Sequence, residues 1–127
     1  MIQSLLQWFR RKWEARREAV MFERAVVVRW DDAGIEATYP KGDVEAIRWD
    51  EVERIAIETN DSGPWGADFW WIIEGSSHRC AYPQGATGEV EAIDVLGKRF
   101  PEFDWNELAR ASGSATNARF VCWERAK

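Results

Sequence analysis

The chain has few of the side chains that carry most catalytic and metal chemistry. It contains one histidine, His78, and two cysteines, Cys80 and Cys122. A zinc site needs a cluster of histidine, cysteine and carboxylate ligands, and His78 and Cys80 have no evident third partner. Any Ser–His or Cys–His nucleophile pair would have to use His78 as its base. We therefore expect no metal, no cofactor and no catalytic residue, and we expect both thiols to be reduced and buried.

Long apolar runs are missing as well. No segment approaches the roughly 20 apolar residues that span a bilayer, and charges interrupt the first apolar residues within about ten positions, unlike a signal peptide. The expected location is cytoplasmic. Glycine-rich phosphate loops are also absent, because Gly85–Gly88 lacks the lysine and the spacing of a P-loop.

Basic residues are scarce outside the N-terminal segment. Residues 1–25 hold six basic and three acidic side chains, net +3, whereas the remaining 102 residues hold eleven basic and nineteen acidic ones, net −8. The body of the chain should repel phosphates, so we expect no nucleic-acid partner.

The N-terminal segment, residues 1–24, is predicted to be an amphipathic helix, because its apolar residues recur at helical spacing. The stripe consists of Ile2, Leu5, Leu6, Phe9 and Trp13, with Trp8 at its border. Such a basic helix packs on its own domain or on a second copy, lies on an anionic membrane surface, or docks on another partner. Trp8, Phe9 and Trp13 are therefore candidate contact residues.

Large rings and β-patterns are abundant, with nine tryptophans and six phenylalanines. Ile55–Thr59 alternates like a half-buried strand, and Phe69–Ile73 is apolar on both faces, as in a central strand covered on both sides. We expect further strands over residues 23–30, 35–39, 44–49, 78–82 and 119–125.

Two helices are predicted in the C-terminal part. The first covers residues 88–99, and its expected buried face consists of Val90, Ile93, Leu96 or Gly97, and Phe100. The second begins at Asp104, which with Glu107 fits a capping box, and runs through Ala111. The predicted fold class is α+β. We expect an antiparallel six- to seven-stranded sheet or partly open barrel over a single domain, residues 25–127, with the N-terminal helix and a C-terminal helix packed on it.

The loop between the two central apolar runs, residues 60–68, is a candidate contact surface. Trp65 follows Pro64 between two glycines, and an exposed tryptophan on a positioned loop is typical of a binding hot spot. The alternative is that Trp65 folds back over the sheet. Asp61 and Asp68 flank the loop. Two acids around a loop aromatic are one pattern of acid–base catalysis, whereas an aspartate before Gly-Pro typically caps a turn, and we count both among the candidate contact residues.

The order of elements from residue 26 to about residue 100 resembles bacterial pleckstrin-homology-like domains. A strand is followed by a D-x-x-G turn (Asp31–Gly34), a second strand and then IRWDEVERI (Ile47–Ile55). In those families an I-x-W-x-x-I/V-x-x-I segment leads from the third strand into the next. Two features depart from the family: a second short helix and a further strand follow the usual closing helix, and the first hairpin lacks a basic cluster. Phosphoinositide binding is therefore not implied.

A second resemblance is to a set of uncharacterised proteobacterial proteins. It is carried by T-x-D-x-G-P (Thr59–Pro64), the FW pair Phe69-Trp70, and N-A-R-F (Asn117–Phe120). This likeness implies no particular activity.

Together these patterns predict a non-enzymatic protein-binding or scaffold module whose partner is another protein or a second copy. One alternative is a cytoplasmic immunity protein that masks a toxic enzyme, because a small acidic chain suits a basic active-site cleft. A second alternative is a peripheral membrane adaptor that uses residues 2–24.

Overall fold

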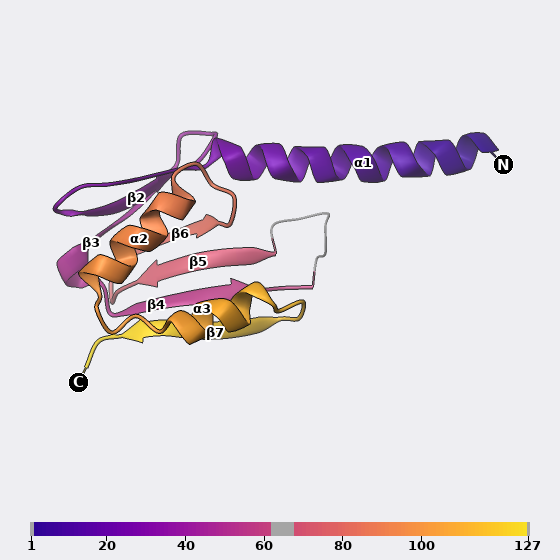
Figure 1. Ribbon diagram of the computed structural model, residues 1–127. Helices are drawn as coiled ribbons and strands as arrows, with labels where there is room; N and C mark the ends of the chain where they lie inside the picture. Colours follow the sequence, from indigo (N-terminus) through magenta and orange to yellow (C-terminus); the bar gives the residue numbers. More distant parts are fainter. Residues whose placement is uncertain (1, 62–67, 127) are drawn as a thin grey trace.

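The computed structural model describes residues 2–61 and 68–126, and within them seven strands form two antiparallel sheets (Figure 1). The first sheet, in the order β1-β2-β3, consists of Val27–Trp30, Gly34–Thr38 and Val44–Arg48. The second sheet, in the order β6-β5-β4-β7, consists of Arg79–Pro83, Phe69–Glu74, Arg54–Thr59 and Ala118–Glu124. The α+β class and the antiparallel pairing are confirmed. The expected single sheet or partly open barrel is corrected to two sheets that are not closed into a barrel.

The change of sheet occurs at the 3₁₀ helix η1, Trp49–Glu51, which lies between β3 and β4. The Trp49 amide donates to the Ala33 carbonyl at 3.0 Å, and its indole Nε1 donates to the Asp31 carbonyl at 2.9 Å. These bonds hold η1 against the β1–β2 turn. The chain therefore turns away from β3, and β4 pairs with β5 and β7 instead.

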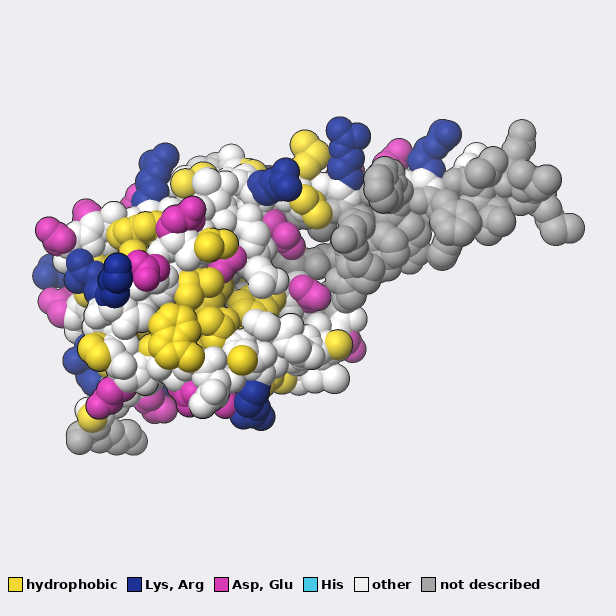
Figure 2. Space-filling view, viewed as in Figure 1, with side chains coloured by type: hydrophobic (Ala, Val, Ile, Leu, Met, Phe, Trp, Pro, Cys, Tyr) yellow, Lys and Arg dark blue, Asp and Glu magenta, His cyan; other side chains and the backbone are white. Residues whose placement is uncertain are grey.

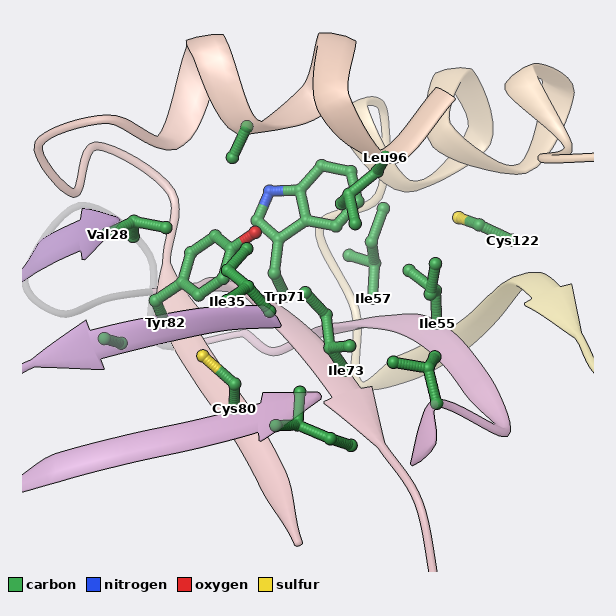
Figure 3. Packing of buried hydrophobic residues seen from close by; sticks show 14 of the residues in the cluster. Val28, Ile35, Ile55, Ile57, Trp71, Ile73, Cys80, Tyr82, Leu96 and Cys122 are labelled. Atoms are coloured by element: carbon green, nitrogen blue, oxygen red, sulfur yellow. The ribbon is translucent and has the colours of Figure 1, made fainter. Parts of the chain in front are cut away.

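Strand β5 lies in the interior of the second sheet, between β4 and β6, as the Phe69–Ile73 pattern predicts. Trp71 and Ile73 face the main core, and Figure 3 shows Trp71 among the isoleucines of β4 and below Leu96. Ile72, on the opposite face, is also buried, at 5% exposure. The other two residues on that face, Trp70 and Glu74, are only half-buried, so the predicted coverage on both sides is confirmed for the Trp71 face and is incomplete on the Ile72 face.

Helices α2, Glu89–Arg99, and α3, Trp105–Ser112, pack on the core face of the strands. Helix α3 has half of the predicted capping box. Asp104 accepts hydrogen bonds from the amides of Asn106 and Glu107, but the Asp104 amide donates to the Cys122 carbonyl and Glu107 pairs with Arg110. Gly113 ends the helix, as expected for a C-cap.

The buried face predicted for α2 is partly wrong. Leu96 and Phe100 are buried, but Val90 is 71% exposed and Ile93 only half-buried, while Glu89 and Ala92 turn inward. The reason is a polar contact inside the core: the Glu89 carboxylate accepts from Trp71 Nε1 at 3.2 Å and from the Gly85 amide at 3.3 Å. These bonds rotate the helix away from the face that its apolar spacing favours.

Helix α1 spans Ile2–Ala25 and extends away from both sheets (Figure 1). The expected packing of this helix on the domain is therefore corrected: among the described residues, its contacts with the domain come from its C-terminal end. The helix continues through Glu23 and Arg24, so the first strand begins at Val27, later than the expected residue 23. None of the helices in the described ranges is both long and apolar enough to cross a membrane.

Candidate functional site

The predicted loop site lies partly outside the described residues. Asp61 and Asp68 are both exposed at the two ends of the loop, and the Asn60 amide donates to the Asp68 carbonyl at 3.1 Å. The Asp61 amide donates to Asn117 Oδ1 at 3.3 Å. Pro64 and Trp65 lie outside the described residues, so the loop as a contact surface stays a prediction.

The three aromatic candidates of the N-terminal segment, Trp8, Phe9 and Trp13, lie on α1. Their side chains are also outside the described part of the structure, and their role as contact residues stays a prediction.

The two cysteines are free and buried, as expected. Burial raises the pKa of each thiol to about 12, so both are protonated near neutral pH. Cys80 lies on β6 and Cys122 on β7, which form opposite edges of the second sheet. This topology separates Cys122 from the β6 edge, where His78 precedes the strand.

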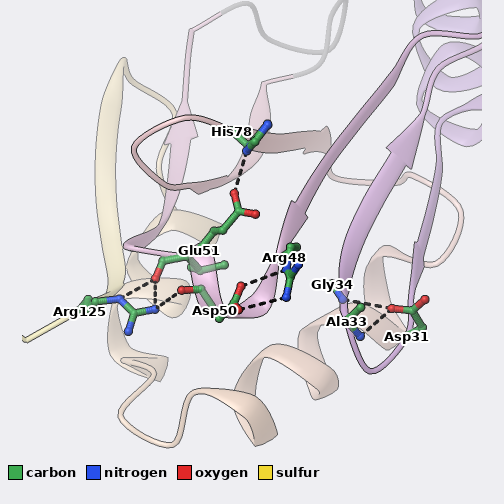
Figure 4. Close-up of polar contacts among 9 residues, drawn as sticks. Asp31, Ala33, Gly34, Arg48, Asp50, Glu51, His78 and Arg125 are labelled. Atoms are coloured by element: carbon green, nitrogen blue, oxygen red, sulfur yellow. Dashed lines mark hydrogen bonds and ion pairs between the residues drawn. The ribbon is translucent and has the colours of Figure 1, made fainter.

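His78 pairs with Glu51, with 2.7 Å between Nδ1 and Oε2 (Figure 4). Both residues line a depression of about 570 Å³, together with Arg29 and Arg48. Arg48 is itself paired with Asp50. The depression is lined by charges of both signs, and the side chains of His78 and Glu51 are 61% and 35% exposed, so neither is buried away from water. Within residues 2–61 and 68–126, no three histidine, cysteine or carboxylate side chains are placed to hold a metal ion.

An apolar surface on the two C-terminal helices is the more distinctive feature. Figure 2 shows hydrophobic side chains gathered over α2 and α3. Val90 is 71% exposed and Trp105 is 51% exposed, and Ile93 is half-buried. We call this surface, formed by Val90, Ile93, Gly97 and Trp105, the Val90–Trp105 patch.

The position of Trp105 in the patch is fixed by its neighbours. Trp105 is the first residue of α3, directly after the Asp104 cap, and its ring centroid lies 4.8 Å from that of Phe103. The indole also lies against Gly97: a Cβ atom at that position would come within 2.5 Å of Trp105 Cζ2. The absence of a side chain at Gly97 therefore allows the indole ring to pack directly against α2.

The charge around the patch is unbalanced. All three basic side chains of residues 88–112 make ion pairs with carboxylates. They are Lys98 with Asp94, Arg99 with Asp32, and Arg110 with Glu107. Glu91 and Glu102, by contrast, are exposed and make no ion pair within the described residues. The helical layer thus presents apolar side chains beside uncompensated negative charge.

Sequence reasoning missed this patch because it assigned Val90 to the core. The spacing of Ala92 and Leu96 offers a second possible buried face, but the spacing alone does not choose between the two. The choice depends on the indole donor of Trp71, which comes from a distant strand.

No protein-family model, no curated protein and no solved structure matches this chain. The pleckstrin-homology-like and proteobacterial resemblances therefore stay expectations drawn from the motifs.

Proposed function

We propose that the protein is a non-enzymatic binding module that docks a protein partner on the Val90–Trp105 patch. The observation that carries the proposal is the exposure of Trp105 and Val90 on a surface built from two helices. Tryptophan combines a large apolar area with few rotatable bonds, and it is enriched among the residues that dominate binding energy.

The patch is rigidly supported, which favours recognition. Trp105 is held by Gly97 and Phe103, and α3 is fixed by its N-cap. A side chain ordered before binding loses less conformational entropy when a partner covers it. An exposed apolar cluster with a polar rim is the usual appearance of such an interaction surface.

The charge of the rim suggests the chemistry of the partner. Glu91 and Glu102 make no ion pair within the described residues, so a basic group brought by a partner could pair with them without breaking an existing ion pair. The proposed partner is therefore a protein segment that carries an apolar anchor flanked by lysine or arginine. If the partner is an enzyme with a basic cleft, the module acts as its inhibitor.

The proposal is tested by selecting displayed peptides on the immobilised full-length protein and measuring the affinity of the selected peptides. We expect peptides with an aromatic or aliphatic anchor and basic flanks. Trp105→Gln and Val90→Gln should each weaken these peptides by about tenfold or more, the loss expected of a hot-spot residue.

The matched control is Val44→Gln, because Val44 is also an exposed valine, at 56%, but lies on β3. Peptides that bind Val90→Gln and Trp105→Gln as tightly as the unmodified protein would remove the patch as the binding site. Thermal unfolding of each variant checks that the fold is retained.

A further inference from the structure

Helix α1 is attached to the domain through its C-terminal end. The rings of Phe22 and Tyr39 are in contact, with centroids 6.4 Å apart, and Thr87 Oγ1 donates to the Arg24 carbonyl at 2.7 Å. Val26, immediately after the helix, is fully buried. From this attachment α1 runs away from the sheets for about 36 Å, at 1.5 Å per residue (Figure 1).

Val20 lies on a different side of α1 from the residue that contacts the domain. Val20 precedes Phe22 by two residues, a rotation of about 200° around the helix, so the two side chains point to nearly opposite sides. Val20 is 37% exposed. By sequence spacing it follows Trp13 by seven positions and Phe9 by eleven, which places it on the same line of the helix. Val20 is thus partly exposed, and by sequence spacing alone the line continues along the part of α1 that extends away from both sheets (Figure 1).

The described charges of α1 complement those around the patch. Arg10, Arg11 and Arg17 are exposed and form no ion pair within the described residues. Arg10 and Arg17 lie within about 80° of Val20 around the helix and border the apolar line, whereas Arg11 and Glu18 lie on the opposite side. The helix thus offers an apolar line with arginine beside it.

These are the features that the Val90–Trp105 patch would select in a partner. We infer that α1 of a second copy docks on the patch and that the exchange is reciprocal, giving a two-fold dimer in which each α1 covers the partner's α2–α3 surface. Helix α1 extends from its attachment away from both sheets, whereas the patch lies on α2 and α3, so the length of α1 does not lie along its own patch (Figure 1). Each contact of the dimer thus covers one α1 and one patch, two exposed apolar surfaces whose flanking charges are opposite in sign. This inference rests on the proposed function of the patch.

The test is sedimentation velocity of the full chain over a range of concentrations. We expect a dimer that weakens as salt rises, because arginine–carboxylate attraction is screened. Val20→Gln and Val90→Gln each damage both contacts of a homodimer. Because each altered contact should cost roughly tenfold in affinity and the homodimer has two such contacts, each substitution should raise the dimer dissociation constant by about a hundredfold. Met21→Gln and Val44→Gln are the matched controls, since both residues are exposed but lie off the two surfaces.

A mixture of the two variants gives the most specific result. In a heterodimer of Val20→Gln with Val90→Gln, one contact joins an unaltered α1 to an unaltered patch. The mixture should therefore form more dimer than either variant alone at the same total concentration.

Three outcomes would overturn the dimer. They are a monomer at all concentrations, a dimer unaffected by both substitutions, and a mixture no more associated than its components. A monomer that floats with vesicles containing anionic lipid, and loses flotation in Val20→Gln, would assign α1 to a membrane surface instead. If the dimer fails while selected peptides still require Trp105, the proposed function stands without self-association. If the selected peptides also bind without requiring Trp105, both the patch as a docking site and the dimer are rejected.

Discussion

Among single residues, Glu89 connects the interior of the domain to the orientation of α2. It is 4% exposed, and its carboxylate accepts hydrogen bonds from Trp71 Nε1 and from the Gly85 amide. An apolar side chain at this position would leave the buried indole donor without a partner. The same contact that buries Glu89 exposes Val90, so one carboxylate inside the core determines which α2 residues are available for binding.

The Glu89 carboxylate also predicts a dependence of stability on pH. Burial raises its pKa above the ordinary 4.5, against the opposing hydrogen bonds from Gly85 and Trp71. The folded protein therefore holds this proton more tightly than the unfolded chain does. The stability that this group contributes is fully present below the unfolded pKa and is lost as pH rises through the folded pKa.

Glu89→Gln should remove this loss while keeping an oxygen that accepts from the indole. Relative to the variant, the unmodified protein should lose free energy of unfolding as pH rises from about 4.5 towards neutrality. Urea unfolding at a series of pH values measures the difference, with the exposed Glu91→Gln as the control for a lost charge. A difference between the two proteins that stays constant with pH would contradict the prediction.

Among the elements, α3 depends on its N-terminal cap to present Trp105. Asp104 Oδ1 accepts from the amides of Asn106 and Glu107 at 3.0 and 3.3 Å. Asp104→Ala should lower the free energy of unfolding by about 1 kcal/mol, whereas Asp104→Ser should lower it less, because serine also caps helices. Urea unfolding measures both changes.

The comparison for this cap is Asp94→Ala on α2, where the aspartate makes an exposed ion pair with Lys98. Surface pairs of this kind contribute only a few tenths of a kcal/mol. An Asp104→Ala protein no less stable than Asp94→Ala would show that the cap does not hold α3.

How far the sequence predicts an element depends on whether its signal is local. The Asp104 cap and the Ile55–Thr59 strand are local signals, and the structure confirms both, although Ala56 on the outer face is buried as well. The face of α2 is not local, because it depends on Trp71. Strand partners are not local either: β7 pairs with β4 rather than with β6, and no turn sequence encodes that choice. The Val90–Trp105 patch could not be predicted because it follows from the orientation of α2.

At the scale of the whole molecule, the two sheets are joined by side chains where their edges meet. Tyr39 Oη donates to the Ala81 carbonyl at 2.5 Å, and Glu45 Oε1 accepts from the Ala81 amide at 2.9 Å. Burial raises the pKa of Tyr39 to about 12, so its hydroxyl remains a donor throughout the ordinary pH range. Two side chains of the first sheet thus satisfy the backbone of Ala81 at the edge of β6, which limits the pairing of that residue with other chains.

The two bonds to Ala81 have separable effects. Glu45→Ala removes the acceptor of the Ala81 amide, whereas Tyr39→Phe removes the donor to its carbonyl. Each should lower the free energy of unfolding by about 1–3 kcal/mol, because a polar group is left without its partner. Hydrogen exchange of the Ala81 amide should accelerate in Glu45→Ala well beyond the acceleration in Tyr39→Phe, in which that amide keeps its acceptor. Amides inside the β4–β5 ladder serve as the reference for global stability. Equal exchange of the Ala81 amide in both variants would mean that Glu45 does not protect this edge.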